Sequence, residues 1–151
     1  MAKSSSESAN RYWLLKSEPD VYGWDHLIAE HEGTWDGVRN HRAANNLRAM
    51  QVGDEAFFYH SNIGKEIVGI VRISQAGLTD PADAAWASVK VTPVRKLKRT
   101  VTLKEMKADP ALADMEVVKL SRLSVAEVRP EEWQHVLGLA EGTPPEAAGK
   151  D

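Results

Sequence analysis

The chain has 151 residues, a formal net charge of −3 and no cysteine. The charge argues against a protein held on nucleic acid by bulk electrostatics alone, and the absence of cysteine excludes disulfides, thiolate chemistry and cysteine–zinc sites. No apolar run approaches the ~20 residues of a membrane-spanning helix, and residues 1–10 contain no signal-peptide core. We therefore expect one cytoplasmic domain over residues 11–141, without membrane contact, between a disordered leader (1–10) and a flexible tail (142–151).

Short strands and helices alternate in the first half of the chain. The segment from Arg11 to Ser17 predicts a strand, which Glu18-Pro19 ends because proline cannot donate to a sheet ladder. A helix over Trp24 to Glu30 follows, and its apolar residues expected to face inward are Leu27 and Ile28. Asn40 is expected to cap a helix that reaches Met50 and carries one apolar stripe.

The middle of the chain is richer in strand signals. Gly53-Asp54 predicts a turn into a strand over Glu55 to His60. Runs rich in β-branched residues predict two further strands, over Glu66 to Ser74 and over Trp86 to Leu97. The intervening stretch from Gln75 to Ala85 is predicted to be a surface loop.

The last third combines short helices with one strand. Thr102 to Glu105 reads as a capping box that opens a helix, and Asp109-Pro110 is expected to open another. A strand from Ser121 to Arg129 precedes a closing helix that begins at Pro130 and buries two apolar residues, Trp133 and Leu137. Five to six strands with short helices predict an α+β domain built on a curled, barrel-like mixed sheet.

Two clusters combine aromatic rings with planar hydrogen-bonding groups. In Trp35 to Asn40, an indole precedes a glycine turn, an arginine and an asparagine, and in Phe57 to Asn62 an aromatic run leads into His60 and two polar residues. Such a combination is typical of a pocket for a heteroaromatic ring, which stacks on the aromatic surface while hydrogen bonds read its edge. Lys16-Ser17-Glu18 adds a charge, a hydroxyl and a carboxylate at the end of the first strand.

Several of these residues have a structural alternative. Trp35 suits the wall of a pocket and a plug of the core equally well, and Trp24 suits the core or the pocket rim. A buried, hydrogen-bonded Tyr59 and a turn-capping Glu18 are also compatible with the pattern. The remaining tryptophans lie in apolar strands or on a helix face and are expected in the core: Trp13, Trp86 and Trp133.

Basic residues gather in two places. Their pattern fits a solvated surface as well as it fits a modest track for phosphate groups. The candidates for contact with a nucleic-acid backbone are Arg42, Arg48, Arg95, Lys96, Lys98 and Arg99.

Signatures of enzymes and cofactors are missing from the sequence. It has no glycine-rich phosphate loop, no His-Glu-x-x-His and no Gly-x-Ser-x-Gly, and its five histidines show no metal-ligand spacing. We therefore predict no catalytic residues, no metal and no cofactor. The alternatives that stay open are an enzyme that acts on a modified base or nucleotide through Glu18 or Asp36, and a module that binds a small molecule or nucleoside.

From about Tyr12 to Leu139 the chain resembles the EVE domain family, a member of the PUA-like superfamily that is related to YTH domains. The resemblance rests on ordered segments, which are Tyr12–Pro19, Trp35–Asn40, Ala44–Met50, Gly53-Asp54, Phe58–Asn62, Ile67–Ile70 and Ser121–Val125. It implies a PUA-like β-barrel flanked by helices. It also implies capture of a modified base of DNA or RNA without chemistry. Separately from the resemblance, we expect the chain to be a monomer.

The resemblance further implies which side chains surround the base. Trp35 occupies the place of a YTH-like cage tryptophan, whereas His41 stands where relatives often carry another aromatic, and the loop before Trp86 lacks one. The expected pocket residues are Lys16, Ser17, Glu18, Trp24, Trp35, Val38, Arg39, Asn40, Tyr59, His60, Ser61 and Asn62.

Overall fold

The computed structural model describes residues 11–141, so the predicted leader and tail lie outside the described residues. One sheet organises the chain, with strands in the order β2-β5-β4-β3-β1-β6. β1 and β3 pair in parallel, and the other neighbours pair antiparallel. The strands are β1 (Tyr12–Ser17), β2 (Gly33–Trp35), β3 (Glu55–His60), β4 (Glu66–Asp80), β5 (Asp83–Thr102) and β6 (Val125–Val128).

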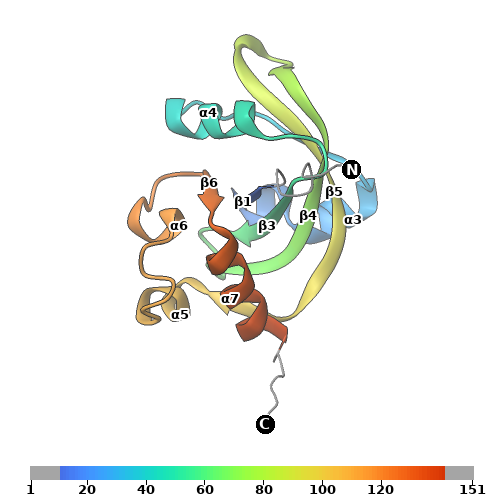
Figure 1. Cartoon of the computed structure of the whole chain (residues 1–151). Coiled ribbons are helices and arrows are strands. Elements are labelled where there is room, and N and C mark those ends of the chain that lie inside the picture. Colours follow the sequence, from blue (N-terminus) through green and yellow to red (C-terminus); the bar gives the residue numbers. More distant parts are fainter. Residues whose placement is uncertain (1–10, 142–151) are drawn as a thin grey trace, which may run out of the picture.

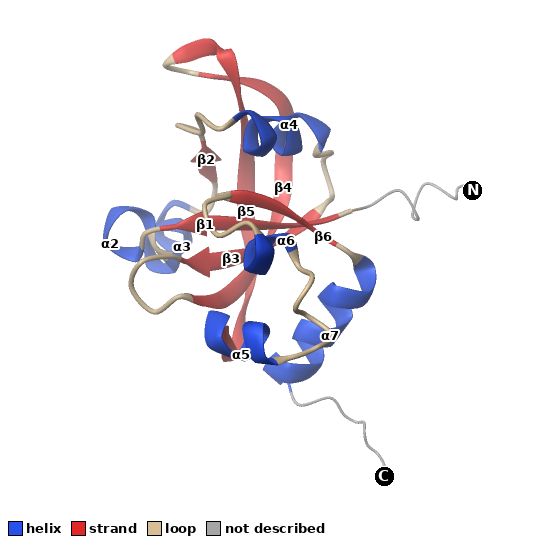
Figure 2. Ribbon diagram, turned by 90° about the vertical axis from the view of Figure 1, so that its left-hand side faces the viewer, coloured by secondary structure: helices blue, strands red, loops and turns tan. Residues whose placement is uncertain are grey.

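The sheet is strongly curled, and β4 and β5 run through the whole molecule (Figure 1). The predicted α+β class with a curled mixed sheet is confirmed, but the barrel stays open because β2 and β6 are edge strands. Figure 2 shows α2 and α3 at one side, α4 beside the upper part of the β4–β5 hairpin, α6 at mid-height beside β6, and α5 and α7 below. The helices are α2 (Pro19–Tyr22), α3 (Trp24–Glu30), α4 (His41–Ala49), α5 (Leu103–Ala108), α6 (Glu116–Lys119) and α7 (Pro130–Glu141).

Capping residues recognised in the sequence predicted the starts of two helices correctly. The Asn40 side chain accepts a hydrogen bond from the Ala43 amide at 2.9 Å and so caps α4, as predicted. The capping box at α5 is also present, since the Thr102 hydroxyl accepts from the Glu105 amide and the Glu105 carboxylate accepts from the Thr102 amide. In α7 the buried Trp133 ring stacks on Phe57 with ring centroids 4.0 Å apart.

The prediction of a surface loop from Gln75 to Ala85 is wrong. β4 and β5 continue as a hairpin to Asp80 and Asp83, with a short turn between them. The hairpin extends beyond the core, so its residues are mostly exposed or half-buried and lack the apolar runs that mark buried strands. Main-chain pairing, rather than burial, therefore holds this part of the sheet.

Four other predictions need correction. The strand expected from Ser121 begins only at Val125, because turns occupy the preceding residues. Asp109-Pro110 opens a series of turns instead of a helix, since the Asp109 carboxylate accepts from the Ala111 amide in a local turn. Two side chains expected in the interior also lie at the surface, since Ile28 is 44% exposed and Trp86 is only half-buried.

Candidate nucleic-acid interface

The parallel pairing of β1 and β3 brings two of the predicted clusters together. Lys16 lies opposite Tyr59 and Ser17 lies opposite His60, and the Ser61 amide donates to the Ser17 carbonyl at 2.9 Å. Parallel strands end at the same edge of a sheet, so the polar side chains after each strand converge there. We call this edge, Lys16–Glu18 with Tyr59–Asn62, the β1–β3 edge.

Lys16 ties the β1–β3 edge to the loop before β6. Its ammonium group donates to the Ser121 carbonyl at 2.9 Å and lies 5.7 Å from the centroid of the Tyr59 ring. Burial lowers the pKa of Lys16 from its ordinary 10.5. Burial also raises the pKa of Tyr59 to about 12, helped by the charge of Glu66. The Tyr59 phenol therefore stays protonated at neutral pH and keeps its hydrogen for donation.

Two tryptophans flank Phe58, which lies in the middle of β3. The Trp24 and Trp35 rings meet the Phe58 ring edge-on, with centroids 5.7 and 5.4 Å away. Trp24 is only 5% exposed and Trp35 only 7% exposed, while Tyr22 covers Trp35 edge-on at 6.1 Å. A base therefore has access only to a margin of the Trp35 ring, unless the loop that follows Trp35 moves. The role of Trp35 as a stacking wall stays a prediction.

His60 has a fixed hydrogen-bonding state. The Trp24 amide donates to its Nε2 atom at 3.1 Å, so the neutral ring carries its proton on Nδ1. Burial lowers the pKa of His60, opposed by the carboxylates of Glu66 and Asp25 and assisted by Lys96. These same residues line a cleft of about 300 Å³ beside α3. At neutral pH, His60 is therefore an uncharged donor in a cleft of a size suited to a small ligand.

The loop between Trp35 and α4 is held by a side chain that the sequence did not single out. Asp80 is buried, and its carboxylate accepts hydrogen bonds from the Gly37 amide at 2.8 Å, from Arg39 at 2.9 Å and from the Ala82 amide at 2.8 Å. The hydrogen bond from Arg39 and those from the two amides hold the pKa of Asp80 at about 2. The available sequence signal is an acid beside Pro81, but the surrounding stretch predicts a surface loop instead of a hairpin tip.

Replacing Asp80 with asparagine is expected to loosen this loop and to remove one pH dependence of stability. The folded-state pKa of about 2 lies below the ordinary 3.8. The stabilisation from Asp80 is therefore complete above about pH 4 and is lost as the pH falls toward 2. Unfolding midpoints of both proteins across this range provide the measurement. Asp83→Asn, which changes an acid at the same tip, is the control, and parallel midpoints of wild type and Asp80→Asn would contradict the assignment.

Asn40 and Val38 reach the predicted region from the other side. Val38 is 7% exposed, whereas Asn40 is exposed and lines a hollow of about 290 Å³ with Arg42 and the segment Leu120–Leu123. Because Lys16 binds the carbonyl of Ser121, the hollow adjoins the β1–β3 edge. The structure thus brings together the segments 35–40, 58–62 and 121–125, although they lie far apart in the chain.

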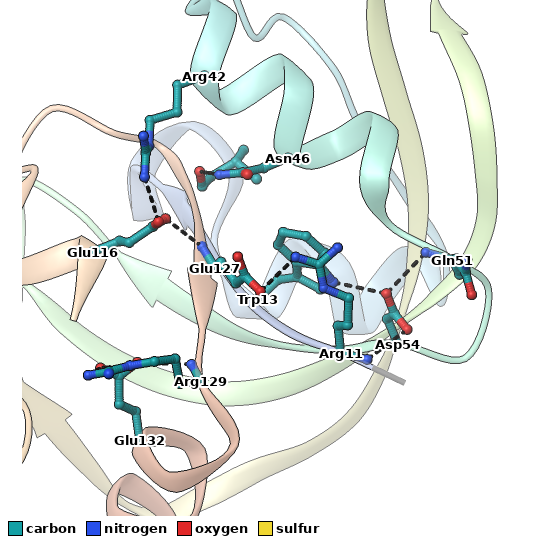
Figure 3. Close-up of polar contacts among 11 residues, drawn as sticks. Arg11, Trp13, Arg42, Asn46, Gln51, Asp54, Glu116, Glu127, Arg129 and Glu132 are labelled. Carbon is teal, nitrogen blue, oxygen red and sulfur yellow. Dashed lines mark hydrogen bonds and ion pairs between the residues drawn. The ribbon is translucent and has the colours of Figure 1, made fainter. Parts of the chain in front are cut away.

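All four of the predicted backbone-contact arginines already have acceptors within the chain. Arg42 pairs with Glu116 at 2.7 Å (Figure 3), Arg95 with Glu141 at 2.5 Å and Arg99 with Glu105 at 2.9 Å. Arg48 donates to the Asn45 side chain and to the Ala85 carbonyl. Phosphate groups would compete with these partners, so the role of this set, Lys96 and Lys98 included, stays a prediction.

Among residues 11–141, no group of three or more His, Asp or Glu side chains is arranged to hold a metal ion. Over the same residues, no helix is long and apolar enough to cross a membrane.

Comparison with known proteins gives the family. The model of the EVE domain matches residues 11–139, and the chain belongs to this family. Thymocyte nuclear protein 1 of Mus musculus is 34% identical over an alignment of 178 positions, gaps included, which covers 94% of this chain and 79% of the relative.

Two solved structures show the same fold. The NMR structure of a Rhodopseudomonas palustris protein has a TM-score of 0.84 at 44% identity, over 93% of this chain and 99% of that one. The crystal structure of human THYN1 protein in complex with DNA containing 5-methylcytosine has a TM-score of 0.77 at 32% identity. That comparison covers 89% of this chain and all (100%) of the human chain.

Proposed function

We propose that residues 11–141 form a non-catalytic module that captures a modified base of DNA or RNA at the β1–β3 edge. The observation that carries the proposal is the register of β1 and β3, which sets Ser17 beside His60 at one sheet edge. The human relative of the same fold, crystallised with DNA containing 5-methylcytosine, supports a modified cytosine as the ligand.

The side chains of this edge suit recognition without chemistry. The Ser17 hydroxyl and the Nδ1–H group of His60 offer hydrogen bonds to the edge of a base, and the exposed Glu18 carboxylate can accept from an exocyclic amino group. Unstacking a base costs a few kcal/mol, least in a single strand. A methyl group returns only about 0.8 kcal/mol when it is buried, so discrimination requires a closely fitting apolar wall such as Val38 with the margin of Trp35.

Ser17→Ala and Trp35→Phe are expected to lower the affinity for a single-stranded oligonucleotide containing 5-methylcytosine, and Trp35→Phe also lowers the preference over unmodified cytosine. Each change removes a hydrogen bond or part of an aromatic wall, so we expect a loss of about 5- to 100-fold. Trp35→Ala is less informative, because emptying this buried site costs about 3–5 kcal/mol of stability. Titration with modified and unmodified oligonucleotides measures both quantities.

Ser74→Ala is a matched control, since Ser74 is a strand serine whose hydroxyl bonds to Glu32, away from the edge. If both site variants fold and keep the wild-type affinity and preference, the proposed pocket is wrong. Mass spectrometry of the incubated oligonucleotide separates binding from catalysis. We expect an unchanged mass, and a product that disappears in Glu18→Gln would replace the binding module with an enzyme.

A further inference from the structure

An aromatic stack lies at the surface where β5 leaves the hairpin. Trp86 is half-buried, whereas each of the other tryptophans is at most 7% exposed. The exposed His41 ring stacks on Trp86 with centroids 5.0 Å apart and an interplanar angle of 26°. The Arg39 guanidinium carbon lies 5.4 Å from the centroid of the same indole. One indole, one imidazole and one guanidinium group thus form a cluster that solvent reaches.

Two anchors fix the cluster to the sheet. Asp80 holds Arg39 from the tip of the hairpin, and Arg48 donates to the Ala85 carbonyl at 3.2 Å, next to Trp86. Trp86 and Arg48 also line a hollow of about 220 Å³ between α4 and the hairpin. The Arg39 side chain and the main chain next to Trp86 are therefore held in place before any ligand arrives, which lowers the entropy cost of binding.

We propose that Arg39, His41 and Trp86 form a second nucleotide site, which takes the unpaired base next to the captured one. The inference rests on the proposed function and extends its footprint along the same strand. Arg39 and His41 flank Asn40, which lines the hollow beside the β1–β3 edge. The same short segment thus supplies Asn40 to the hollow and two side chains to the cluster, so the proposed path of the strand runs from the edge across this hollow to the cluster.

The chemistry of the cluster favours a single-stranded base. Every base has a π-face, so a base of any sequence can stack on the His41 ring, which itself stacks on Trp86. The Arg39 guanidinium group adds a cation–π contribution. One nitrogen of Arg39 is engaged by Asp80, so stacking rather than ion pairing carries the binding. The contribution of Trp86 should therefore change little with salt concentration, unlike that of a phosphate contact.

The test uses a short single-stranded DNA oligonucleotide with one central 5-methylcytosine, and the same strand with an abasic site on either side of it. We expect one of the two abasic strands to bind the wild-type chain about 5- to 100-fold more weakly. Trp86→Ala should lose a similar factor with the intact strand, and the abasic site should then cause no further loss. Such non-additivity shows that the missing base and the missing indole belong to one coupled site.

Two further variants guard against loss of structure. His41→Ala removes an exposed ring and should weaken binding with the fold intact, while Trp86→Phe should retain most of the affinity. Val94→Ala, which trims an exposed apolar side chain of the same strand, should bind as wild type. Unfolding midpoints monitor each protein.

Abasic sites that leave wild-type binding unchanged on both sides would overturn the second site, as would additive losses from the abasic site and Trp86→Ala. The proposed function fails by a different result, namely equal affinity of the wild-type chain for modified and unmodified strands. Coupling between Trp86 and the flanking base could still be measured on the unmodified strand in that case, so the two failures are distinguishable.

Discussion

Gly69→Ala is expected to destabilise the domain by about 3 kcal/mol or more, because the core has no room for an added methyl group. A Cβ atom at this position would lie 2.5 Å from the Cζ3 atom and 2.6 Å from the Cη2 atom of Trp24. The Trp24 ring is itself enclosed, being 5% exposed and edge-on to Phe58. Thermal unfolding should show a midpoint lower by about 10 °C.

Gly77→Ala is the matched control for Gly69→Ala. Gly77 has a positive φ of 71° and open space around the added atom, so its substitution tests backbone strain without a clash. We expect a cost of about 1–2 kcal/mol there. Combining Gly69→Ala with Trp24→Leu should cost less than the sum of the single changes, because the smaller side chain relieves the clash. Additive losses, or a Gly69→Ala protein as stable as wild type, would show that the packing is looser than described.

The close approach at Gly69 also positions a candidate site residue. Gly69 pairs with Phe58 in the neighbouring strand, next to a register shift before Tyr59. With the Trp24 ring seated over Gly69, the Trp24 amide reaches the His60 ring. Substitution at Gly69 is therefore expected to disturb the hydrogen-bonding state of His60 as well as the stability of the core.

Signals contained in a few neighbouring residues predicted much of the fold. The cap at Asn40, the capping box at Thr102 and the turn at Gly53-Asp54 each satisfy backbone groups locally, so their meaning does not depend on the rest of the chain. The outer part of the β4–β5 hairpin has no such local signal. Its strands are stabilised by each other and by α4, and their alternating exposed residues carry no strong apolar period.

The candidate site was predictable as residue types but not as an arrangement. The clusters at Trp35–Asn40 and Phe57–Asn62 were recognised from their chemistry, and the pairing of β1 with β3 brings the second one beside Lys16. The hydrogen bond from the Gly37 amide to Asp80 joins residues 43 positions apart in sequence, and no local pattern encodes such a contact. The same holds for the exposure of Trp86, which depends on how α4 meets the hairpin.

Asp54→Ala is expected to destabilise the domain by about 3 kcal/mol or more, because three hydrogen-bond donors lose one shared acceptor. The Asp54 carboxylate is fully buried. It accepts from the Trp13 indole at 2.9 Å, from the Arg11 amide at 3.1 Å and from the Gln51 amide at 3.1 Å (Figure 3). Asp54→Asn keeps the shape but turns an amino group toward one donor, so it should lose about half as much. Denaturant unfolding measures both, with the exposed Asp114→Ala as control.

Asp54 should also influence the β1–β3 edge from the opposite end of the strands. It joins the start of β1 to the turn before β3, and the register set there continues to the pairing of Ser17 with His60. Hydrogen exchange of the Ser61 amide, which donates to the Ser17 carbonyl, reports on that far end. We expect Asp54→Ala to reduce the protection of Ser61 more than that of the Trp133 amide in α7. Equal losses at both amides would mean that Asp54 supports stability alone, whereas a larger loss at Ser61 would make this buried carboxylate the residue that aligns the two strands of the proposed base site.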